Sequence, residues 1–106
     1  MMGAVKRIGS ASAMATRWRR RRMCILLAGD RPAPGALRDI SARGAFLETN
    51  ARPALGSKVE LRHPEAGSIA ATVKSIADDG VGLGFICGEA SMAFALAAVA
   101  ADMSRP

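Results

Sequence analysis

The stretch 36–49, Ala-Leu-Arg-Asp-Ile-Ser-Ala-Arg-Gly-Ala-Phe-Leu-Glu-Thr, predicts two short β-strands that are separated at Gly44. The first strand, 36–41, carries two apolar side chains that can anchor it to a core. The second strand, 45–49, continues after the glycine. Two strands this close together predict an antiparallel pair, and the segments on either side extend the same pattern.

Strands are also predicted before and after this pair. Met23–Ala28 is a bounded apolar run, which is typical of a strand covered on both faces. Gly29–Gly35 is dense in glycine and proline, so a loop is expected there. Lys58–His63 alternates strictly between polar and apolar residues, the period of a half-buried strand. His63 ends this strand and is expected to be exposed and without a chemical role.

Two more strands follow a turn at 64–67. Ser68–Ala77 carries apolar residues on one face, and Asp78-Asp79-Gly80 is a hairpin signal of the Asp-Gly kind. In the next strand Gly82 and Gly84 occupy one face, and the other face carries Val81, Leu83, Phe85 and Cys87. Six short strands with turns between them favour a six-stranded antiparallel β-barrel.

A helix is predicted at the C-terminal end, from Glu89 to Met103. Its larger apolar residues recur at helical spacing: Met92, Leu96, Val99 and Met103. Such a stripe usually faces the core of its own domain, and the helix would then cover one opening of the barrel. Contact with a partner or with a second copy of the chain is the alternative. The predicted fold class is therefore all-β with a C-terminal helix.

Positive charge is concentrated at the N-terminal end of the chain. The 106 residues carry a formal net charge of +6, yet residues 1–22 contain seven basic residues and no acidic one. Residues 1–16 are rich in Gly, Ala and Ser, and we expect them to form a disordered arm. Residues 17–106 are expected to form one domain. A basic arm attracts polyanions such as nucleotides, nucleic acids or anionic membranes.

Several function classes are disfavoured by composition. The two cysteines, Cys24 and Cys87, lie in apolar stretches without metal-ligand spacing, and buried thiols in a reducing cytoplasm are expected. No metal site, cofactor or catalytic constellation is predicted, so the chain is not expected to be an enzyme. The apolar run 23–29 is too short for a membrane span, and a cytoplasmic location is expected.

Two motifs flank the first strand. The first is Arg-x-x-x-Arg, carried by Arg17 and Arg21 within a run of five arginines, with Arg22 as the alternative second arginine. The second is Asp-x-Ser-x-x-Gly, carried by Asp39, Ser41 and Gly44. This pair of motifs resembles the PilZ family, whose members bind the bacterial second messenger cyclic di-GMP. The resemblance spans residue 17 to the C-terminus and implies a PilZ-like β-barrel that binds this ligand.

The resemblance assigns a role to each motif. Guanidinium groups match the O6/N7 edge of guanine and phosphate oxygens, and a carboxylate accepts from ring N–H groups. Arg17 and Arg21, with Arg22 as a possible substitute for Arg21, would hold guanine and phosphate, and Asp39, Ser41 and Gly44 would bind the other guanine. Arg43 is a candidate for a further phosphate contact, and Trp18 either stacks on a base or packs on the barrel.

Simpler explanations stand beside these roles. Arginine runs are common as solvated charge or as nucleic-acid arms. Asp39 and Ser41 often make local hydrogen bonds near turns, and Gly44 would then serve only to allow positive φ.

The resulting hypothesis is a cyclic di-GMP sensor whose N-terminal arm changes conformation on binding and signals to an effector protein. It is expected to be a monomer or weak dimer, without a specific nucleic-acid partner. The alternative is a degenerate PilZ-like interaction module that does not bind nucleotide. A nucleic-acid-binding protein is a third reading, which the nearly neutral barrel disfavours.

Overall fold

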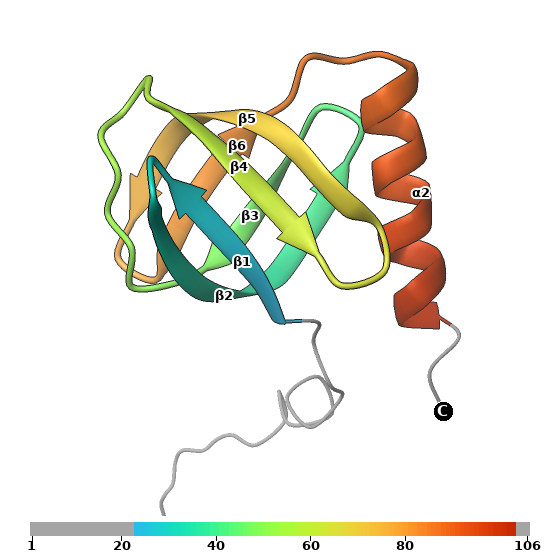
Figure 1. Cartoon of the computed structure of the whole chain (residues 1–106), viewed down its shortest axis with the longest axis horizontal. Coiled ribbons are helices and arrows are strands. Elements are labelled where there is room, and N and C mark those ends of the chain that lie inside the picture. The colour runs from blue at the N-terminus through green and yellow to red at the C-terminus, as the bar shows by residue number, and fades with distance from the viewer. Residues whose placement is uncertain (1–22, 104–106) are drawn as a thin grey trace, which may run out of the picture.

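The computed structural model describes residues 23–103, which form a closed six-stranded antiparallel β-barrel followed by one helix (Figure 1). Around the barrel the strands lie in the order β1-β2-β3-β6-β5-β4. The elements are β1 Met23–Ala28, β2 Arg31–Ser41, β3 Gly44–Glu48, β4 Lys58–His63, β5 Gly67–Ala77, β6 Gly80–Gly84 and α2 Glu89–Met103. The predicted fold class is confirmed. Because β6 lies between β3 and β5, the strands β2, β3, β6 and β5 form one continuous surface.

The strand β2 begins earlier than expected. The loop predicted at 29–35 is wrong, because only Gly29 and Asp30 form the turn and β2 pairs with β1 from Arg31 onward. Pro32 and Pro34 lie within this pairing at alternate positions. A proline lacks only its own N–H, and in an antiparallel strand the N–H groups of alternate residues point to the same side. Pairing of β2 with β3 starts only at Ala36, so these missing donors leave the ladder with β3 intact.

The barrel is filled by side chains that alternate with outward-facing residues along each strand. The least exposed large ones are Leu26, Leu47, Leu61, Val73 and Val81. His63 belongs to this interior at 4 % exposure, so its expected exposure is wrong. Its Nδ1 accepts hydrogen bonds from the backbone N–H groups of Glu65 and Ala66, both at 3.0 Å. The imidazole therefore shapes the β4–β5 turn instead of facing solvent.

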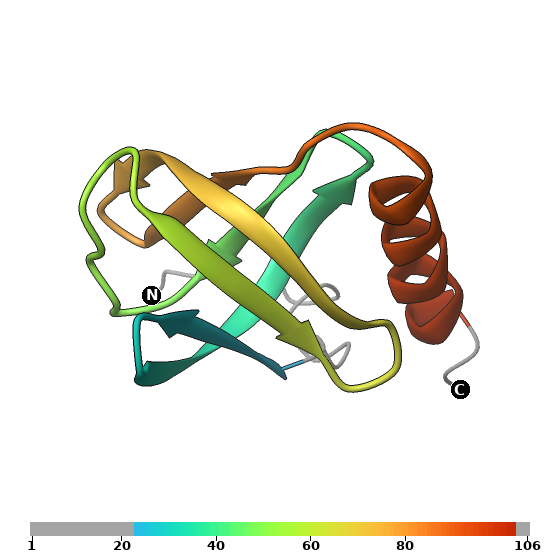
Figure 2. The ribbon, with the colours of Figure 1, turned by 45° about the horizontal axis from the view of Figure 1, so that its top comes forward.

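Helix α2 lies at one end of the barrel (Figures 1 and 2) and packs on it through Ser91, Phe94 and Ala98. The Phe94 ring meets the rings of Phe85 and His63 edge-on, at centroid distances of 5.9 and 6.2 Å. The expected packing of the larger apolar stripe against the barrel is wrong. Those four side chains are exposed instead: Met92, Leu96, Val99 and Met103. The helix is apolar on both sides, and one ring side chain determines which side faces inward.

The two cysteines lie in different environments. Cys24 is buried in the barrel, whereas Cys87 is exposed, so the expectation of burial is wrong for Cys87. The reason is that β6 ends at Gly84 and the following loop leaves the barrel surface. No disulfide joins the two residues. Burial, with a smaller contribution from the negative charge of Asp102, raises the pKa of the Cys24 thiol to about 11.

We expect iodoacetamide at pH 8 to modify the native protein once, at Cys87. Only a thiolate is nucleophilic, and with a pKa of about 11 roughly a thousandth of Cys24 is ionised at that pH. Mass spectrometry after labelling should show one adduct on the native chain and two in urea. Cys87→Ser should leave the native protein unlabelled. Equal native labelling of both cysteines would contradict the burial of Cys24.

Candidate functional site

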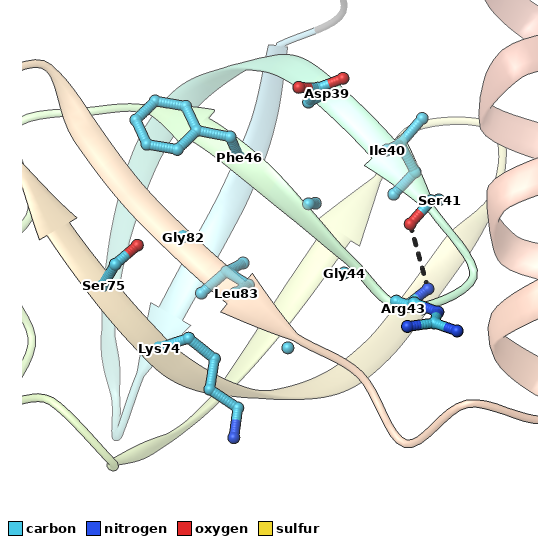
Figure 3. Close-up of a pocket in the computed structure, with 12 residues that line it drawn as sticks. Asp39, Ile40, Ser41, Arg43, Gly44, Phe46, Lys74, Ser75, Gly82 and Leu83 are labelled. Atoms are coloured by element: carbon cyan, nitrogen blue, oxygen red, sulfur yellow. Dashed lines mark hydrogen bonds between the residues drawn. The ribbon is translucent and has the colours of Figure 1, made fainter.

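An open pocket of about 560 Å³ lies on the outer surface of the barrel across β2, β3, β6 and β5 (Figure 3). Its lining includes all three residues of the second motif, Asp39, Ser41 and Gly44. The sequence placed the first two on one face of a strand, and the structure puts both at the rim of this pocket. The register of β2 is interrupted between Leu37 and Asp39, so a β-bulge sets the direction of the strand just before the motif.

Ser41 ends β2 and shapes the turn that follows. Its Oγ accepts a hydrogen bond from the backbone N–H of Arg43 at 3.1 Å. This is the local bond that a serine commonly makes at a turn. It occupies one lone pair of the hydroxyl oxygen, and the O–H group can still donate to a bound molecule. Ser41 therefore combines a structural role with the chemistry of a ligand contact.

Gly44 is required by the close approach of two strands. A Cβ atom at this position would overlap the backbone carbonyl oxygen of Leu83 on β6. Gly44 pairs with Gly84 across the β3–β6 ladder. The positive-φ glycines of the described chain are Gly29, Gly56 and Gly67, so the expected need for positive φ at Gly44 is wrong. The glycine serves strand packing and leaves the pocket open to the backbone.

The floor of the pocket comes from β6, and sequence analysis did not include it in the site. Gly82 and Gly84 occupy outward-facing positions that alternate with the buried residues Val81, Leu83 and Phe85. A Cβ at Gly82 would overlap the Ser75 hydroxyl oxygen, so no side chain fits there without displacing Ser75. The alternating glycines were visible in the sequence. Their neighbours were not, because only the strand order places β6 beside β3.

Phe46 lines one wall of the pocket, and Arg38 holds its ring in place. The guanidinium carbon of Arg38 lies 4.1 Å from the centroid of the Phe46 ring, in cation–π geometry. The Arg38 guanidinium also contacts Glu48 at 3.0 Å and Asp79 at 2.8 Å. The hydrogen bond from Arg38 lowers the pKa of Asp79. These contacts hold the Phe46 ring in place at the pocket, with the Arg38 guanidinium covering one face of the ring.

The arginines of the first motif, Arg17, Arg21 and Arg22, lie outside the described residues, as does Trp18. The described chain begins at Met23, which pairs with Ala36 on β2, three residues before Asp39. In the sequence, Arg22 immediately precedes β1. This strand pairs with β2, which carries Asp39 and Ser41.

The family model of the PilZ domain matches residues 14–93. The chain belongs to the PilZ domain family. The match includes both motifs and all six strands of the barrel. Comparison with curated proteins and with solved structures returned no match. The family assignment of this PilZ domain therefore rests on the family model together with the closed barrel.

Within residues 23–103 no group of three or more His, Cys, Asp or Glu side chains is assembled that could hold a metal ion. In the same range no helix combines the length and the hydropathy needed to cross a membrane.

Proposed function

We propose that this protein is a cyclic di-GMP sensor that passes the ligand-bound state to an effector protein. The observation that carries the proposal is the shared pocket of Asp39, Ser41 and Gly44 on a PilZ barrel. Members of this family bind cyclic di-GMP, and the second motif is complete here. The proposal assigns the protein to binding, without a catalytic step.

The chemistry of the pocket suits a guanine base. The Asp39 carboxylate is exposed at the rim and can accept hydrogen bonds from ring N–H groups. The Ser41 hydroxyl adds a second polar contact on the same side, and Phe46 adds apolar surface to the pocket lining. In this proposal Arg17 and Arg21, with Arg22 as the alternative, close over the second guanine and the phosphates from the N-terminal side. Ordering that segment on binding supplies the conformational change that an effector recognises.

A surface that could contact an effector adjoins Asp39. This residue also lines a groove of about 240 Å³ between β2 and α2, together with Val99 and Met103. Both belong to the exposed apolar stripe of α2, a surface suited to a protein contact. We propose that the protein acts in the cytoplasm as a monomer or weak dimer, and that nucleic acid is not its specific partner.

The second candidate function is a PilZ module that contacts proteins and binds no nucleotide. It is favoured by the internal roles of two motif residues. Ser41 already accepts a hydrogen bond from Arg43, and Gly44 is needed for the packing of β3 on β6. A barrel without ligand would keep both. In such a module, Asp39 and the arginines of the first motif would have no assigned structural role.

We expect the purified protein to bind cyclic di-GMP with a Kd near micromolar, which corresponds to a binding free energy of about −8 kcal/mol. Isothermal titration calorimetry measures this, with GTP and cyclic di-AMP as controls that should give much weaker heats. Binding should persist between about 50 and 200 mM salt, whereas retention of DNA by the basic arm should fall by orders of magnitude. Absence of heat up to millimolar cyclic di-GMP would favour the interaction module. Salt-resistant, sequence-selective DNA binding would favour a nucleic-acid protein.

A further inference from the structure

A lysine that belongs to neither motif projects over the pocket floor. Lys74 lies on β5 at the point where the register with β6 shifts between Val73 and Ser75. Bulges of this kind redirect a side chain and are common beside binding sites. A Cβ built on Gly84 would stand 2.7 Å from Cε of Lys74 and 2.9 Å from its Cγ. The methylene stem of Lys74 thus lies over Gly84, in the space that a side chain on β6 would fill.

A second cation flanks the same floor from the opposite side. Gly84 pairs with Gly44 on β3 and with Thr72 on β5, so β6 runs between the two strands. Arg43 immediately precedes Gly44, and its backbone oxygen accepts a hydrogen bond from the N–H of Phe85 at 2.8 Å. This bond holds the β2–β3 turn against the end of β6. Figure 3 shows the Arg43 and Lys74 side chains on either side of that strand end.

These two cations differ from Arg38, Arg62 and Lys58 in the partners of their side chains. Arg38 and Arg62 form ion pairs with acids, and Lys58 donates to the Thr72 hydroxyl at 3.3 Å. No ion pair is found for Arg43 or Lys74 among residues 23–103. Two cations without an acidic partner, about two interstrand spacings of ~4.8 Å apart, face one open glycine floor. An anion that reaches this floor meets positive charge on both sides.

We propose that Lys74 binds a phosphate group of the ligand, opposite Arg43, across the floor formed by Gly82 and Gly84. The inference rests on the proposed function and divides the pocket into two parts. Asp39 and Ser41 contact the base edge, and the ammonium of Lys74 contacts an anionic phosphate oxygen. The glycines let the phosphate approach without steric hindrance. The barrel thereby supplies phosphate contacts of its own, in addition to those of the N-terminal arginines.

The test compares two lysine variants of the full chain. Lys74→Met removes the ammonium and keeps the stem over Gly84, and Lys58→Met makes the same charge change on β4, outside the pocket. In calorimetry with cyclic di-GMP at about 50 mM salt, we expect Lys74→Met to weaken binding roughly tenfold or more, Lys58→Met to match the unaltered protein, and Lys74→Arg to retain binding. Lys74 is exposed, so thermal unfolding should be the same in all variants.

A second measurement separates this inference from the proposed function. Pyrophosphate, which has no base, should shift the amide NMR signals of Gly82 and Gly84 in the unaltered protein and in Lys58→Met, but not in Lys74→Met. If cyclic di-GMP binds equally well to Lys74→Met, the role of Lys74 is refuted and the sensor function stands. If cyclic di-GMP does not bind but the pyrophosphate shifts depend on Lys74, the sensor function is refuted and the anion site stands. Failure of both measurements refutes both.

Discussion

Asp39→Ala is expected to weaken cyclic di-GMP binding by at least about 100-fold while the melting temperature stays unchanged. Hydrogen bonds to a charged group contribute about 1.5–3 kcal/mol each, and a carboxylate facing a guanine edge can accept two. The side chain is exposed at the pocket rim and buries no apolar area, so its loss costs the fold little. Calorimetry and thermal unfolding monitored by circular dichroism check the two parts.

The matched control is Asp78→Ala, which removes an exposed carboxylate from the β5–β6 turn, outside the pocket. Both variants raise the net charge by one, so a purely electrostatic effect would strengthen binding in each. A control that weakens binding as much as Asp39→Ala would remove the special role of Asp39. A clear fall in the melting temperature of Asp39→Ala would show that the residue is structural.

Phe94→Ala is expected to lower the free energy of unfolding by about 3–5 kcal/mol, the range for removing a buried aromatic side chain. Phe94 is 4 % exposed and contacts the rings of both Phe85 and His63. Its loss would leave a cavity where α2 meets the barrel. For a domain of this size that is a large part of the total stability. Urea denaturation followed by circular dichroism measures the change.

Leu96→Ala is the internal comparison, since the two residues are two positions apart on the same helix. Leu96 is 70 % exposed, so its truncation should change the free energy of unfolding by no more than about 0.5 kcal/mol. Equal destabilisation by the two variants would mean that α2 packs through its other face.

The sequence predicted the barrel because its local signals agree with one another. The bounds expected for β1, β4 and α2 match those observed, since each is a clear periodic run between turn residues. The start of β2 was missed because proline usually ends a strand. Here the two prolines meet only one neighbouring strand, and that depends on where β3 ends.

The inward face of α2 was outside the reach of periodicity. Alanine-rich helices are apolar on several sides, and a stripe of four larger residues was the stronger pattern. Phe94 overrides it because one buried ring fills the space beside Phe85 and His63. The burial of His63 was missed for a related reason. Its partners are the turn that follows it and Phe94 on α2, far along the chain, and neither is visible from the strand alone.

The candidate site was predicted as far as one segment carries it. Asp39 and Ser41 share a strand, so their common face follows from the period of two. Lys74, Gly82 and Gly84 reach the pocket only through closure of the barrel in the order β3-β6-β5. Nothing in the local sequence marks Lys74 as different from Lys58, since the bulge that redirects it arises from the pairing of β5 with β6.

The packing of Gly44 against Leu83 means that this glycine of the second motif is needed for folding as well as for any ligand contact. Any other residue at position 44 would disturb the folded barrel whether or not a ligand binds, because its Cβ has no room beside the Leu83 carbonyl oxygen on β6. Selection on folding alone would therefore preserve Gly44 even in proteins that no longer bind the nucleotide. Gly44 alone is therefore evidence for the barrel architecture and not for nucleotide binding. Asp39 is exposed and meets no such packing constraint, so under the proposed function its replacement would be the earlier sign that nucleotide binding has been lost.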